Sequence, residues 1–141
     1  MKKEALLGVS TSNRNWYNNV KGNNATMVNY FTNGWEPKQL NKGGRLHIGE
    51  KKKIYATGEY VETIQDTVEN FFNNDKFNWK TNGLLSEEET EADFLKLLSN
   101  VTGQHLSLNS KVTCIVIDNV DYHNKSVSSQ KPFNQGIVYL D

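Results

Sequence analysis

The stretch RLHIGEKKKIYATGEYVETI, residues 45–64, decides the fold class of this chain. Apolar, β-branched and aromatic residues form short runs in it, and the turn residues Gly49-Glu50 and Gly58 separate these runs. That pattern is typical of β-hairpins and not of helices. We therefore expect adjacent antiparallel strands over residues 45–48, 53–57 and 59–64.

A second β segment, VTCIVI at residues 112–117, is almost wholly apolar and is flanked by polar residues. An apolar run of this length predicts a buried central strand, in which Cys114 is a buried, inert thiol. A turn is expected after it, at Asn119-Val120-Asp121. Shorter strands are predicted near both ends of the chain and before the Asn33-Gly34 turn, over residues 4–10, 27–31 and 137–140.

The clearest helix signal lies between these two β segments. Ser86 and Glu89 have the spacing of a capping box, and apolar residues then recur at helical spacing until Gly103. A helix is therefore predicted from Ser86 to about Val101. The remaining patterns predict a short helical turn over 13–20 and a surface loop over 35–44.

The length of 141 residues predicts a single domain, 1–141, with its own core. Three Trp, six Tyr and six Phe supply much of the apolar area. The predicted class is α+β, a small barrel-like sheet of five to six strands with flanking helices. No apolar stretch approaches the length of a membrane span or of a signal-peptide core, so we expect a cytoplasmic protein without a membrane partner.

The net charge is zero, but the charges are unevenly distributed. Residues 1–53 hold ten Lys and Arg against three acids, and residues 54–110 hold three against ten. Aromatic residues alternate with the basic ones in the first segment, and nucleic-acid binding needs this combination, since bases stack on rings while Lys and Arg hold phosphates. An ordinary core with a solvated basic face has the same composition, so both interpretations stay open.

The sequence contains no pattern typical of a catalytic, metal or cofactor site. The lone Cys114 excludes an internal disulfide and a cysteine-based zinc site. The three histidines are far apart and lack the spacing of metal ligands. A binding protein is therefore expected, with no catalytic residue, metal or cofactor. An enzyme is the alternative, and it would need three residues to converge in a pocket: Asp118, Asp121 and His123.

Two segments resemble the PUA-like superfamily. Residues 40–48, LNKGGRLHI, resemble the start of a characteristic PUA-like strand, and residues 57–61, TGEYV, resemble the strand that follows it. The spacing is similar to that of the EVE/SRA-type branch. The chain also resembles the N-terminal domain that precedes HNH nucleases in modification-dependent restriction enzymes, in the order of five segments: 58–64, 71–83, 86–101, 113–117 and 135–139. Two positions depart from that pattern, Glu59 in place of a glycine and Gly44 in place of an acid.

This resemblance implies a module that recognises a modified, methylated base in duplex DNA by flipping it into a pocket, as the specificity part of a restriction system in phage defence. Any cleavage would come from a fused region or from a nuclease or motor subunit. The implied pocket walls are Trp16, Tyr30 and Trp35, and the implied hydrogen-bonding residues are Ser10, Thr11 and Asn33. The implied phosphate contacts are Lys42, Arg45, Lys51, Lys52 and Lys53.

Two further alternatives remain beside modified DNA and the small enzyme. An RNA-binding PUA or ASCH-like module would recognise unpaired bases and the ribose 2′-hydroxyl. A phage or defence protein that binds another protein would show a contiguous exposed apolar patch.

Overall fold

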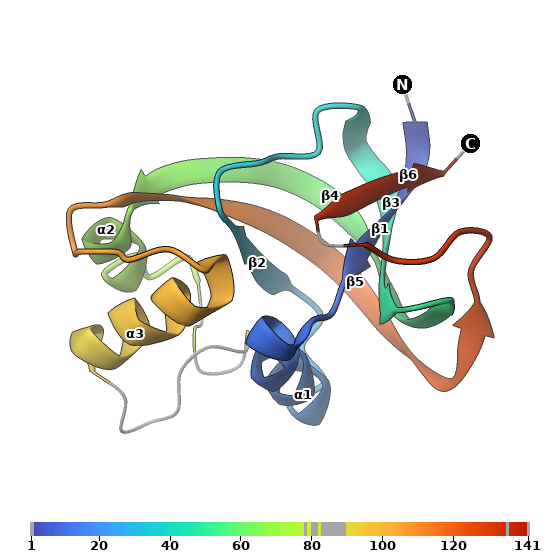
Figure 1. Ribbon diagram of the computed structural model, residues 1–141, viewed down its shortest axis with the longest axis horizontal. Coiled ribbons are helices and arrows are strands. Elements are labelled where there is room, and N and C mark those ends of the chain that lie inside the picture. The colour runs from blue at the N-terminus through green and yellow to red at the C-terminus, as the bar shows by residue number, and fades with distance from the viewer. Residues whose placement is uncertain (1, 78, 80–81, 83–89, 135, 141) are drawn as a thin grey trace.

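Six strands form one mixed sheet in the order β2-β5-β4-β3-β1-β6 (Figure 1). The structure is a computed structural model, and it describes residues 2–77, 79, 82, 90–134 and 136–140. The elements are β1 (Lys2–Gly8), η1 (Thr11–Asn13), α1 (Arg14–Gly22), β2 (Val28–Thr32), β3 (Leu40–Glu50), β4 (Lys53–Thr67), α2 (Val68–Phe72), α3 (Glu91–Thr102), β5 (Lys111–Ser128) and β6 (Ile137–Leu140). The α+β class is confirmed. The sheet is open, with β2 and β6 at its edges, so the predicted barrel is not observed among the described strands.

The stretch 45–64 forms one long hairpin in place of three short strands. β3 and β4 pair as antiparallel neighbours, as predicted, but the turn lies at Lys51-Lys52. Gly58 lies inside β4, where a Cβ atom would come within 2.6 Å of Ile117 Cγ2 on β5. Gly58 therefore permits close packing of two strands and does not mark a turn. β3 also begins at Leu40, which shortens the predicted loop 35–44.

The apolar run 112–117 is buried between β2 and β4, as predicted, and Cys114 is fully buried. The turn predicted at Asn119-Val120-Asp121 is absent. The strand instead continues through an irregular register, with Asn119 at a φ of 51°. Asparagine tolerates this left-handed conformation, so a turn-like residue is accommodated within a bulge of β5.

The helices lie on one face of the sheet and cover the main core (Figure 1). α1 confirms the predicted helical turn, and α3 ends where Gly103 adopts a left-handed φ of 69°. The N-cap of α3 is Thr90, in a capping box with Asp93. The capping box predicted at Ser86 lies outside the described residues. None of the helices described is long and apolar enough to cross a membrane.

The face of the sheet opposite the helices carries a second, smaller core. Residues that lie opposite each other on neighbouring strands have side chains on the same face of a sheet. Leu6 on β1 lies opposite His47 on β3, and His47 lies opposite Thr57 on β4, so all three side chains are on this face. Leu6 packs with Phe133 in this smaller core. The sheet therefore presents two differently built faces, and each of them is hollowed at one place.

Candidate ligand pocket

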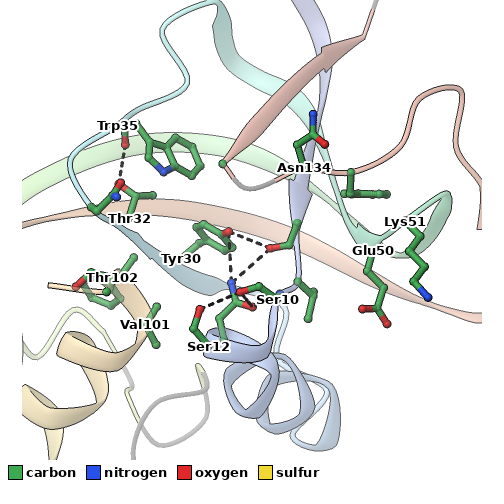
Figure 2. A pocket seen from close by; sticks show the side chains of 18 residues that line it. Ser10, Ser12, Tyr30, Thr32, Trp35, Glu50, Lys51, Val101, Thr102 and Asn134 are labelled. Atoms are coloured by element: carbon green, nitrogen blue, oxygen red, sulfur yellow. Dashed lines mark hydrogen bonds between the residues drawn. The ribbon is translucent and has the colours of Figure 1, made fainter.

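The larger hollow is a cavity of about 580 Å³ in which several distant segments meet (Figure 2). Its lining comes from the end of β1 with η1, from β2 and the loop after it, from the end of α3 and from the β3–β4 turn. Phe133, Asn134 and Gly136 complete it. Small-molecule sites have volumes of about 300–1,000 Å³. The cavity is therefore large enough for a nucleotide.

Two aromatic residues, Tyr30 and Trp35, form one wall of the cavity. Tyr30 is buried and rigidly held, because its hydroxyl donates to the carbonyl of Gly8 at 3.0 Å. Trp16 packs against it edge-on from behind, with ring centroids 5.4 Å apart. Burial raises the pKa of Tyr30 to about 12, so the phenol is neutral at physiological pH.

Trp35 is the more accessible of the two rings. It is half-buried, and its centroid lies 6.0 Å from that of Tyr30. Gly136, with a φ of 85°, lies so close to the indole that a Cβ atom there would be 3.7 Å from Trp35 Cε2. Trp35 is therefore supported from two sides and can offer ring surface to a ligand.

Polar side chains surround this aromatic wall. Ser10, Ser12 and Asn13 form a hydrogen-bonded group below Tyr30, in which the Asn13 amide donates to the Tyr30 hydroxyl at 3.4 Å. Asn134 lies across the cavity from Trp35 (Figure 2). Its side-chain amide and that of Asn33 are exposed and make no hydrogen bond to other described residues. Both amides are thus available to a ligand.

Charges lie at the β3–β4 turn beside the cavity. The carboxylate of Glu50 accepts hydrogen bonds from Arg14 at 2.5 Å and from the Tyr55 hydroxyl at 2.8 Å. These bonds, the one from Arg14 first, lower the pKa of Glu50. Lys51 is exposed at a φ of 55° and makes no ion pair with other described residues. The cavity lining therefore includes an exposed cation next to the Glu50 carboxylate.

Four of the six predicted pocket residues line this cavity: Ser10, Tyr30, Asn33 and Trp35. Trp16 does not line this cavity, because helix α1 turns it inward, where it is 4 % exposed and packs behind Tyr30. Thr11 is exposed and does not line the cavity. Six further polar or charged residues line the cavity and were not predicted from the sequence: Ser12, Asn13, Thr32, Glu50, Thr102 and Asn134.

The predicted phosphate contacts do not form one surface. Lys51, Lys52 and Lys53 are exposed together at the hairpin turn, and Lys51 lines the cavity. Arg45 lies elsewhere on β3 and lines the second hollow, and the exposed Lys42 lines neither.

The second hollow, of about 410 Å³, lies over β3, β4 and β5. Asp121 and His123 line it but Asp118 does not, so the three residues of the enzyme alternative do not converge. His123 Nε2 lies 3.0 Å from Thr57 Oγ1, which lies 2.9 Å from His47 Nδ1. The structure contains no cluster of three or more metal-ligating side chains within the part of the chain that it describes.

Solved structures of an ASCH protein from Zymomonas mobilis are similar to almost the whole chain. One matches with a TM-score of 0.56 and 14 % identity, covering 99 % of this chain and 88 % of that one. A serine-to-alanine variant of the same protein matches at 0.60 and 14 %, covering 99 % and 89 %. The fold is PUA-like. No family model matches the sequence, and no curated protein is similar enough in sequence to match.

The PUA-like resemblance seen in the sequence is thus confirmed at the level of the fold. The neighbours are ASCH proteins, and the finer EVE/SRA-type placement has no support from them. At identities of 12–14 % the similarity concerns the fold alone, so function must be argued from the cavity.

Proposed function

We propose that this chain binds RNA and holds one unpaired base in the cavity beside Trp35. The observation that carries the proposal is the combination of a half-buried indole, two exposed amides and an exposed lysine around one cavity of nucleotide size. RNA-binding modules recognise unpaired bases by stacking on aromatic rings and by hydrogen bonds to base edges. The ASCH-type fold supports the same choice.

The base would stack on Trp35, because Tyr30 is buried and already has neighbours on its ring. The amides of Asn33 and Asn134 both donate and accept hydrogen bonds, so they suit base edges and a ribose 2′-hydroxyl. Neither side chain is held by another described residue. Binding would therefore replace only water at these amides, and would break no hydrogen bond to the described residues.

The arrangement of positive charge favours a single strand over a duplex. Of the predicted phosphate contacts, Lys51 lines the cavity, and Lys52 and Lys53 are exposed next to it at the same hairpin turn, while Arg45 and Lys42 do not line the cavity. A duplex binder needs a longer positive track and must also supply a few kcal/mol to flip a base. An unpaired strand requires only a short track and no flipping.

Competition binding tests this proposal. A labelled single-stranded RNA is displaced by unlabelled RNA, by DNA of the same sequence, and by cytosine-methylated, adenine-methylated and unmodified duplexes. The proposal predicts that single-stranded RNA competes best. Preference for a methylated duplex would favour recognition of a modified base in DNA, and failure of every nucleic acid to bind at low salt would refute both.

A protein partner has less support from the surface. Among the described residues, Val127 is the exposed large hydrophobic side chain, at 49 %. An isolated residue of this kind is normal on protein surfaces. The described surface therefore shows no broad apolar patch for a protein partner.

A further inference from the structure

The face of the sheet opposite the helices carries a hydrogen-bonded chain of four side chains, each from a different strand. The carboxylate of Glu4 on β1 lies 3.2 Å from His47 Nε2 on β3. His47 Nδ1 lies 2.9 Å from the Thr57 hydroxyl on β4, and His123 Nε2 on β5 lies 3.0 Å from the same hydroxyl. Three members of this hydrogen-bonded series, Thr57 and both histidines, line the second hollow.

The direction of these hydrogen bonds follows from their chemistry. A carboxylate only accepts, so His47 Nε2 carries the proton that is donated to Glu4. Burial lowers the pKa of His47, so the ring is neutral at pH 7 and its Nδ1 accepts. The Thr57 hydroxyl therefore donates to His47, and His123 donates to the oxygen of Thr57.

This is the arrangement of an activated hydroxyl nucleophile. A hydroxyl is a weak nucleophile until an adjacent base takes its proton, and a third group normally orients that base. Here His47 is the base, and Glu4 holds its tautomer and orientation. Such constellations are recognised by geometry and by the role of each group, not by position in the sequence.

We propose that Thr57 is the nucleophile of a second site, which cleaves small carboxylic esters through an acyl-threonine. The proposal goes beyond RNA binding and does not depend on it, since Trp35 and the first cavity lie elsewhere. Thr57 is partly exposed in the hollow. The lining also includes two apolar side chains, Ile54 and Val127, which suit a small apolar acyl group.

The charges of the hollow favour a neutral or cationic ester. Arg45 supplies the fixed positive charge among the described lining residues, and Glu59 and Asp121 supply negative charge. Arg45 Nη1 also lies 3.6 Å from Glu4 Oε1. We assign Arg45 to the oxyanion that forms during attack, while the two acids disfavour an anionic substrate.

The chemistry needs only the ester and water. Thr57 Oγ1 forms a bond to the carbonyl carbon as its proton moves to His47 Nδ1. The tetrahedral intermediate then collapses, the bond to the alcohol oxygen breaks, and the departing alcohol takes the proton from His47. In the second half, water attacks the acyl-threonine, its proton passes through His47 to Thr57, and a carboxylic acid leaves.

The test uses p-nitrophenyl acetate with the full chain. We expect an acetyl group on Thr57, found by mass spectrometry of peptides after an acid quench, with a burst of nitrophenolate. His47→Gln should lower the acylation rate at least about a hundredfold, the usual contribution of a general base. Thr63→Val, on the same strand, is the matched control and should keep the wild-type rate, because Thr63 bonds to Tyr60 instead.

The pH profile separates catalysis from a structural role of these side chains. The acylation rate should rise with pH and reach half its maximum below pH 6.5, since the pKa of His47 is lowered. Glu4→Gln should slow the reaction and move this midpoint further down, because the carboxylate favours the protonated ring. Acetyl groups on lysines alone, or equal acetylation of Thr57 in His47→Gln, would overturn the proposal. If His47→Gln does not fold, an unmoved midpoint in Glu4→Gln overturns it.

Discussion

Replacement of the two tryptophans near Tyr30 separates ligand contact from core packing. Trp35→Ala removes a half-buried ring at the cavity wall, and Trp16→Ala removes a ring that is 4 % exposed on the inner face of α1. The two residues contact the same tyrosine from different sides, with centroid distances of 6.0 and 5.4 Å. The two variants thus compare the loss of a ligand-contacting ring with the loss of a core ring beside the same tyrosine.

The two substitutions should change different quantities, the free energy of RNA binding for Trp35→Ala and the free energy of unfolding for Trp16→Ala. Stacking of one base contributes about 1–3 kcal/mol, so Trp35→Ala should weaken RNA binding by about 5- to 150-fold. The urea concentration at which this variant unfolds should be only slightly lower than that of the wild type. A buried tryptophan replaced by alanine costs about 3–5 kcal/mol of stability. For Trp16→Ala we therefore expect a large loss of stability, out of a total of about 5–15 kcal/mol.

The assay pairs fluorescence anisotropy of a labelled single-stranded RNA with urea unfolding followed by circular dichroism. Trp35→Phe serves as the conservative control and should retain most of the affinity, because phenylalanine still offers a ring face. Wild-type affinity in Trp35→Ala would refute the stacking argument. Equal destabilisation of both alanine variants would show that Trp35 is a core residue.

The lysine turn, one glycine and the single cysteine each lead to a further prediction. Replacing Lys51, Lys52 and Lys53 with alanine should weaken RNA binding. In a salt titration, the slope of log K against log salt concentration should become shallower by about 0.7 for each phosphate that is no longer neutralised. Lys21→Ala is the surface control, and an unchanged slope would contradict a role of the turn in phosphate binding. Gly58→Ala should cost about 1–3 kcal/mol in urea unfolding, because the new methyl group would lie 2.6 Å from Ile117 Cγ2, whereas Gly22→Ala in α1 meets no atom within 4 Å and should not destabilise. Cys114 should react with a thiol reagent only as fast as the protein unfolds, since full burial raises the pKa of its thiol; fast labelling of the native state would argue against its burial in β5.

Short-range patterns were sufficient for much of the fold. The apolar run at 112–117 and the alternation at 45–64 identified β5 and the β3–β4 hairpin, because burial and turn chemistry are local properties of the chain. Gly58 resembles a turn residue in the sequence, but it is required by the close packing of β5 against β4 and not by a turn. The parallel pairing of β1 with β3 has no signal in the sequence, since it depends on contacts between distant segments.

The candidate sites were harder to predict for the same reason. Ser10, Tyr30, Asn33 and Trp35 lie close together along the chain and were identified together, while Asn134 reaches the cavity only through the folding of the distant C-terminal segment. The hydrogen bonds that link the side chains of Glu4, His47, Thr57 and His123 depend on the register of four strands. A sequence does not specify this register at one-residue precision.

The most direct test of the RNA site follows the three indole N–H signals by NMR as single-stranded RNA is added. We expect the indole signal of Trp35 to shift, together with the backbone amide signals of Asn33 and Asn134. The signals of Trp16 and Trp79 should not shift, because both side chains are buried. Shifts confined to residues outside the cavity, or an unchanged Trp35 signal at saturating RNA, would contradict the proposed site.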